Sequence, residues 1–144
     1  MKSYIGFIYA IAAAVVWGLA YAIDEKILHT VSPLTLLFIN SLLATLVLLP
    51  FVLMDNGPIK KVISSGRTSL LIILAAFVLL TLGNFLVYSG ISYLGASTAS
   101  IIEIAYPIFV VAFSFFLFGS VPNIYFLIGG LLILLGSFTI IRFG

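Results

Sequence analysis

The sequence has no cysteine, one histidine and only four acidic residues among its 144 positions. Without cysteine there is no disulfide, no thiolate metal ligand and no cysteine nucleophile. One imidazole and four carboxylates leave little material for a metal cage or a hydrolytic site. HExxH and GxSxG motifs and paired carboxylates are absent as well. We therefore expect no enzyme, no catalytic residues, no metal and no cofactor.

Charge is also scarce, at 7% of residues against about 25% in soluble domains. The chain is instead 64% hydrophobic, with a mean hydropathy of +1.40. A net charge of +2 does not indicate a nucleic-acid partner. Apolar runs of about 20 residues are long enough to cross the ~30 Å hydrocarbon core of a bilayer. These runs predict an all-α integral membrane protein with five transmembrane helices, at about 4–23, 33–54, 69–91, 97–118 and 124–141.

Polar and helix-breaking residues mark the predicted ends of the spans. Asp24, Glu25 and Lys26 follow the first span, and we interpret them as a solvated helix end. Ser32-Pro33 opens the second span, with serine as the N-cap and proline at the first helical position. Residues 92–96 form a predicted short turn, so the third and fourth spans should be an antiparallel hairpin.

The fourth span contains one carboxylate, Glu103, and one proline, Pro107. A charged side chain at the bilayer centre costs at least ~2.5–3.5 kcal/mol, so such residues tend to be functional. A proline has no N–H for the carbonyl four residues earlier, which here belongs to Glu103 itself. The spacing predicts a bent helix with two acceptors on one turn. Glu103 either lines a substrate or proton path or joins two helices as a hydrogen-bonded carboxyl group. The bend at Pro107 is either purely structural or a gating hinge.

Further polar and aromatic residues fall inside the spans. Thr81, Asn84 and Tyr88 share one face of the third helix and favour interhelical hydrogen bonds. Trp17 is too deep for an interfacial belt, which leaves cavity lining or core packing. The candidate residues of a substrate or proton path are Glu103, Pro107, Tyr106, Ser100, Asn84, Tyr88 and Trp17.

Small residues recur every four positions along the first span, and two glycines lie seven apart in the fifth. Such stripes let another helix backbone approach closely, within one chain or between subunits. The predicted helix-packing residues are Gly6, Ala10, Ala14, Gly18, Ala22, Gly129 and Gly136.

An odd number of spans places the two termini on opposite sides of the membrane. Lys2, Lys60, Lys61 and Arg67 lie on the N-terminal side, and Lys26 and Arg142 lie on the other side. The positive-inside rule therefore favours a cytoplasmic N-terminus. A bias of four to two is slight enough to permit insertion in both orientations.

The order and spacing of several motifs resemble one repeat of the EamA-type transporters of the drug/metabolite transporter superfamily, over about residues 8–141. These motifs are Trp17-Gly18, Ser32-Pro33, Leu49-Pro50, Ala99-Ser100, Tyr106-Pro107, Phe118-Gly119 and the Gly129/Gly136 pair. The resemblance implies that residues 1–144 are a single five-helix domain. This sequence differs from the family pattern at Tyr106 and Ser120, where the family often has glutamate. It also lacks the second repeat that family members typically carry.

Members of that family carry two five-helix repeats in inverted orientation, with the substrate path between them, and often move small metabolites, amino acids or drugs outward. The resemblance thus implies a small-molecule exporter in a prokaryotic cell membrane, working as an antiparallel homodimer or with a homologous partner. Two alternatives stay open. One is a non-transporting accessory subunit. The other is an exporter of the small multidrug type, although those carry their carboxylate in the first helix, where the first acidic residue here is Asp24.

Overall fold

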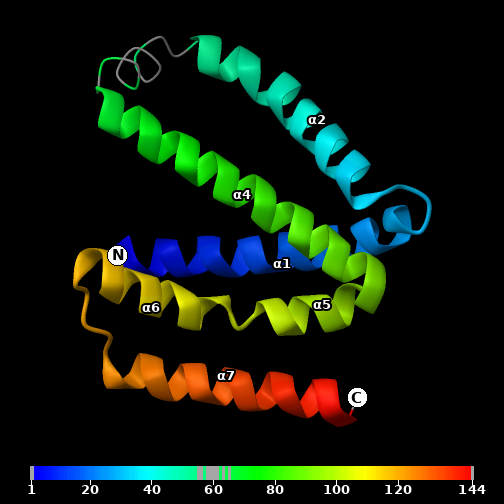
Figure 1. Ribbon diagram of the computed structural model, residues 1–144, viewed down its shortest axis with the longest axis vertical. Coiled ribbons are helices and arrows are strands. Elements are labelled where there is room, and N and C mark those ends of the chain that lie inside the picture. The colour runs from blue at the N-terminus through cyan, green and yellow to red at the C-terminus, as the bar shows by residue number, and fades with distance from the viewer. Residues whose placement is uncertain (1, 55–56, 58–61, 63, 65, 144) are drawn as a thin grey trace.

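The computed structural model describes residues 2–54, 57, 62, 64 and 66–143, and its long elements are all helices (Figure 1). Five stretches are long and apolar enough to span a membrane, in agreement with the prediction. The fourth of them is divided into two helices, α5 and α6. The helices are α1 (Lys2–Leu28), α2 (Pro33–Met54), α4 (Arg67–Leu94), α5 (Ala96–Glu103), α6 (Tyr106–Phe118) and α7 (Ile124–Phe143). The chain is therefore an all-α, multi-pass membrane protein.

The turn predicted at 92–96 is present but shorter than expected, and the first helix continues through the charged residues that we expected to end it. The helix α1 runs on to Leu28, so Asp24 is not solvated but buried, with 8% of its surface exposed. The helix α4 runs on to Leu94, and Gly95 alone separates it from α5. The start of α2 is as predicted, since the Ser32 hydroxyl accepts a hydrogen bond from the N–H of Thr35 at 3.2 Å.

The buried core lies at one end of the helices, at the right of Figure 1, where α1 ends, α2 begins and α4 turns into α5. Its centre is Ile91, which is 1% exposed. The other members come from the same helix ends and are Leu28, Leu36, Leu37, Tyr88, Ala96 and Ala99. Short links hold these four helix ends together, and their small and aliphatic side chains fill the space between them.

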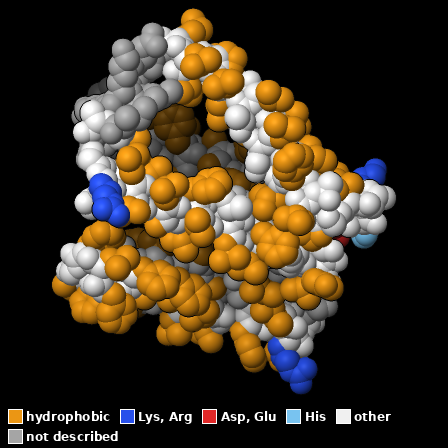
Figure 2. Space-filling model, turned by 45° about the horizontal axis from the view of Figure 1, so that its top comes forward, with side chains coloured by type: hydrophobic (Ala, Val, Ile, Leu, Met, Phe, Trp, Pro, Cys, Tyr) orange, Lys and Arg blue, Asp and Glu red, His pale blue; other side chains and the backbone are white. Residues whose placement is uncertain are grey.

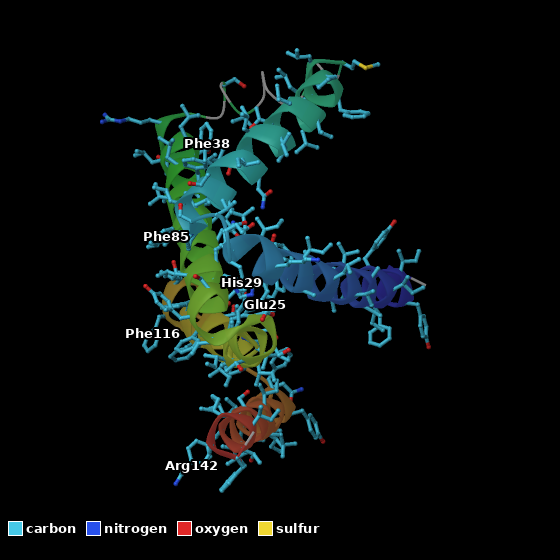
Figure 3. The ribbon with its side chains drawn as sticks, turned by 90° about the vertical axis from the view of Figure 1, so that its right-hand side faces the viewer. Glu25, His29, Phe38, Phe85, Phe116 and Arg142 are labelled. Carbon is cyan, nitrogen blue, oxygen red and sulfur yellow. The ribbon has the colours of Figure 1, made fainter. Side chains whose placement is uncertain are left out.

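Beyond this core the helices separate, and most of their apolar surface is exposed. In each span, between 0% and 11% of the most apolar 18-residue stretch is buried. Figure 2 shows a surface covered by hydrophobic side chains, with lysine and arginine confined to the edges. Figure 3 shows that α1 extends away from the layer that contains α4, α5 and α7. A surface of this composition is suited to lipid or to a further membrane protein.

Of the predicted topology determinants, Arg67 is the first residue of α4. Lys60, Lys61 and the side chain of Lys2 lie outside the part of the chain that the structure describes.

Candidate functional site

A cavity of about 1030 Å³ lies between α1, α4 and the α5–α6 pair. One wall is formed by α1, with small residues and the rings of Trp17 and Tyr21, and the opposite wall combines apolar residues of α4 with the polar residues near the end of α5. Its lining residues are Ala10, Ala13, Ala14, Trp17, Gly18, Tyr21, Ala76, Leu79, Leu80, Gly83, Asn84, Val87, Ser100, Glu103, Ile104 and Tyr106. The volume is at the upper end of the roughly 300–1,000 Å³ typical of small-molecule sites.

Glu103 is the only carboxylate among the described residues of this lining, and it is hydrogen-bonded across the cavity wall to α1. The Tyr21 hydroxyl donates to Glu103 Oε2 at 2.6 Å, which joins residues 82 positions apart. Tyr21 also packs edge-on against Trp17, with ring centroids 5.7 Å apart and an interplanar angle of 74°. The carboxylate is thus fixed beside two aromatic side chains, all three of which face the cavity.

The helix is interrupted directly after Glu103, as the position of Pro107 predicts. The N–H of Ala105 bonds the carbonyl of Ile102 at 3.2 Å, and the N–H of Ile108 bonds that of Ala105 at 3.1 Å. Both are tighter i to i−3 bonds, whereas the N–H of Ile104 keeps the normal i to i−4 bond to the Ser100 carbonyl at 3.0 Å, so the helical pattern breaks at Ala105. Pro107 has no N–H to offer the Glu103 carbonyl. The interruption therefore lies next to the carboxylate.

A serine of α7 compensates one of the carbonyls that the interruption releases. The N–H of Ala105 bonds Ile102 rather than Ile101, and the hydroxyl of Ser137 donates to the Ile101 carbonyl at 3.1 Å. Ser137 is 7% exposed. Because a buried carbonyl without a partner is costly in a membrane, this bond stabilises the bent helix and ties α7 to α5.

The structure brings five of the seven predicted path residues to this cavity, namely Trp17, Asn84, Ser100, Glu103 and Tyr106. Tyr88 is not among them. It is 7% exposed in the core, where its hydroxyl accepts a hydrogen bond from Asn40 Nδ2 at 2.9 Å. Pro107 instead lines a second, apolar groove between α6 and α7. Thr81 bonds the Phe77 carbonyl of its own helix at 2.8 Å.

The predicted packing stripe of α1 faces the same cavity over part of its length, because Ala10, Ala14 and Gly18 are in the lining. Ala22, the last residue of the stripe, is exposed outside this lining. A Cβ atom placed on Gly6, Gly18, Gly129 or Gly136 would meet no atom of another element within 4 Å. Close helix packing at these glycines thus stays a prediction about contacts with another chain.

Sequence reasoning missed the roles of Tyr21 and Glu25. Glu25 Oε2 accepts a hydrogen bond from the N–H of Ala96 at 2.9 Å, at the first residue of α5. Figure 3 shows Glu25 beside the turn between α4 and α5. A carboxylate at a helix N-terminus is favoured by the unpaired N–H groups and by the helix dipole. Only the spacing of Tyr21 from Trp17, one helical turn, hinted at a shared face.

The described residues contain no group of three or more histidine, aspartate or glutamate side chains that could hold a metal ion. Five apolar spans, and a largely apolar cavity between them with a few polar side chains, define a multi-pass membrane protein with room for a small molecule. The model of the EamA-like transporter family matches residues 4–142, and the chain belongs to that family. Its members are transporters of drugs and metabolites. Comparison with curated proteins found no match, and comparison with solved structures found none either.

Proposed function

We propose that this protein exports a small molecule across a prokaryotic cell membrane through the cavity between α1, α4 and α5–α6. One observation carries the proposal: the only carboxylate of the cavity is fixed by Tyr21 at 2.6 Å, directly at the interruption of the α5–α6 span. A broken helix at membrane depth is tolerated where it lines a cavity, and a carboxylate there marks a substrate or ion path.

We propose further that two five-helix units form the transporting assembly in antiparallel orientation. The cavity wall formed by α1 is largely exposed, with Trp17 at 53%. Hydrocarbon disfavours a carboxylate and a broken helix that face lipid, so a second unit is needed to cover them. Two identical copies can reach this arrangement by inserting in opposite orientations, which the slight four-to-two Lys/Arg bias permits, with the N-terminus cytoplasmic in one of them. A homologous chain of opposite orientation would serve equally.

The test is efflux from proteoliposomes of the purified protein, because transport by this protein alone separates a transporter from an accessory subunit. The vesicles are loaded with a mixture of small cations, zwitterions, anions and neutral compounds, and each loss is followed by mass spectrometry. We expect at least one compound to leave faster than from protein-free vesicles. Glu103→Gln should reduce that rate by roughly tenfold or more, in line with the loss of a charged interaction of about 1.5–3 kcal/mol.

Asp55→Asn is the matched control, since Asp55 lies in the polar segment between two spans. It removes one negative charge outside the predicted spans and should leave efflux unchanged. Retention of every compound by the wild-type protein alone would indicate either an accessory subunit or a half-transporter that needs a homologous partner. Wild-type rates in the Glu103→Gln variant would reduce Glu103 to a link between helices.

A further inference from the structure

The charge inventory of the cavity restricts the molecules that it can hold. Glu103 supplies one carboxylate, and among the residues that the structure describes no lysine, arginine or histidine lies in the lining. Basic residues are also absent from the middle of every span, because the six lysines and arginines of the sequence all lie at or between span ends. They are Lys2, Lys26, Lys60, Lys61, Arg67 and Arg142.

A second copy of this chain would not change that balance. It would contribute a second Glu103 and no additional cation within the membrane. In a medium of low dielectric constant, an anion beside a carboxylate is strongly repelled, and a zwitterion leaves its own carboxylate unpaired. A cation is the one charged class that such a cavity compensates.

The neighbours of the carboxylate favour the same class. Trp17, Tyr21 and Tyr106 line the cavity around Glu103, and aromatic faces attract organic cations, tryptophan most strongly. Tyr21 occupies one carboxylate oxygen, Oε2. The other oxygen, Oε1, has no hydrogen-bond partner among the residues that the structure describes. One acceptor is therefore fixed in position while the other is available to a ligand.

We propose that the cavity binds organic monocations with an aromatic or aliphatic body, through the Glu103 carboxylate and the Trp17, Tyr21 and Tyr106 rings. This inference rests on the proposed function and names its substrate class. The other lining residues of α1 and α4, such as Ala10, Leu79 and Leu80, are mostly apolar and accommodate the body of the ligand. Asn84 and Ser100 add polar groups that can orient it.

Trp17 is the only tryptophan of the chain, so its fluorescence reports occupation of this cavity directly. The purified protein in an uncharged detergent is titrated with tetraphenylphosphonium and, separately, with tetraphenylborate. These ions share four phenyl rings and differ in the sign of the charge. We expect a saturable change in Trp17 fluorescence with the cation, and affinity for the anion at least about tenfold weaker.

Three variants assign the preference to the carboxylate. Glu103→Gln should weaken cation binding by about tenfold or more and leave the weak anion binding unchanged or stronger. Glu103→Asp keeps the charge and should keep the preference for the cation. Asp55→Asn should behave as the wild-type protein. The wild-type comparison of the two ions needs no variant, so a folding defect in one of them does not decide the question.

Equal affinity for the two ions, no saturable signal with the cation, or an unchanged cation affinity in Glu103→Gln would each overturn this inference. Efflux of only anionic or zwitterionic compounds from the loaded vesicles would also overturn it, while leaving the proposed transport function standing. Cation binding that depends on Glu103, in a protein that releases no compound from vesicles, would support the site and contradict the transport function.

Discussion

Two tyrosine hydroxyls join helices in this protein, and their surroundings differ. Tyr21 donates to Glu103 at the cavity, whereas Tyr88 accepts from Asn40 in the core. Tyr88 is 7% exposed and Tyr21 is only partly buried. Interhelical bonds in membranes average about 0.6 kcal/mol, and loss of a buried partner costs more when the remaining group stays unpaired. The two hydroxyls should therefore affect different properties.

We predict that Tyr21→Phe changes transport more than stability, and that Tyr88→Phe does the reverse. Without the Tyr21 hydroxyl, Glu103 loses its fixed position, so efflux should change by several-fold. Without the Tyr88 hydroxyl, the half-buried Asn40 amide loses its partner at the edge of the core, which should cost about 1 kcal/mol. Efflux rates and thermal unfolding in detergent, measured on both variants, check this. If both variants lowered the unfolding temperature and neither changed the efflux rate, the assignment of Tyr21 to the path would be contradicted.

The sequence predicts which polar residues lie within the spans but not which of them meet. Glu103 and Asn84 were candidates because their residue types are rare at membrane depth. Their hydrogen-bond partners and neighbours depend on how α1, α4 and α5 pack. The helical repeat of the sequence predicts which residues share a face of one helix, but not which faces of two helices meet. For this reason Tyr88, on the same predicted face as Asn84, belongs to the core while Asn84 lines the cavity.

At the scale of elements, the division of the fourth span follows from Pro107, and the sequence locates it to within one turn. The structure places the irregular residues at 104–105. Ser137 could not be foreseen as a partner of this interruption, because it lies 36 residues from Ile101 and on another helix. Likewise the sequence alone indicates a solvated helix end at Asp24 and Glu25. Only the packed structure shows that Asp24 is buried and that Glu25 binds the first residue of α5.

We predict that Pro107→Ala slows transport without impairing folding. An alanine restores an N–H for the Glu103 carbonyl, so the span can straighten through the interruption. Expression and unfolding temperature should stay normal or rise, while the efflux rate falls. Pro50→Ala is the matched control, because Pro50 also lies inside a helix, α2, away from the cavity. An efflux rate in Pro107→Ala equal to that of Pro50→Ala would remove any gating role from the bend.

We predict that Gly95→Ala destabilises the protein by about 1–3 kcal/mol. Gly95 links α4 to α5 with φ +78° and ψ +159°, a backbone conformation that is essentially restricted to glycine. Its Cβ would also lie 3.1 Å from Glu25 Oε1. Unfolding in detergent measures the cost. Gly90→Ala provides the comparison, since a Cβ on that helical glycine would make only an ordinary contact, 3.8 Å from the Ala99 Cβ, and alanine should be tolerated there.

On the scale of the whole molecule, the number of spans and the fold class could be predicted from apolar run length, and both agree with the structure. The location of the core at one end could not be predicted. Every span is hydrophobic on all sides, so hydropathy does not distinguish a face that packs against protein from one that faces lipid. Leu36, Leu37 and Ile91 are no more apolar than the exposed leucines around them.

We predict dual topology, with a substantial fraction of the chains in each orientation. The cysteine-free sequence permits single cysteines at Val121 and at His29, two exposed positions in links at opposite ends of the spans. A membrane-impermeant thiol reagent applied to intact cells should label a part of each variant. Labelling of one variant alone would instead indicate a fixed orientation and require a homologous partner. An active, monodisperse monomer would exclude both arrangements.

The position of the core has a mechanical consequence. The helices pack together mainly at the ends that meet in the core, so a rotation about the core, as the fulcrum, would move their far ends most. The 27 residues of α1 extend about 40 Å at 1.5 Å per residue. A rotation of about 10° at the fulcrum would displace the far end by roughly 7 Å over that length, more than one helical turn. Small changes around Gly95 and Glu25 would thus be amplified at the opposite face of the membrane, at a distance from the bond between Tyr21 and Glu103.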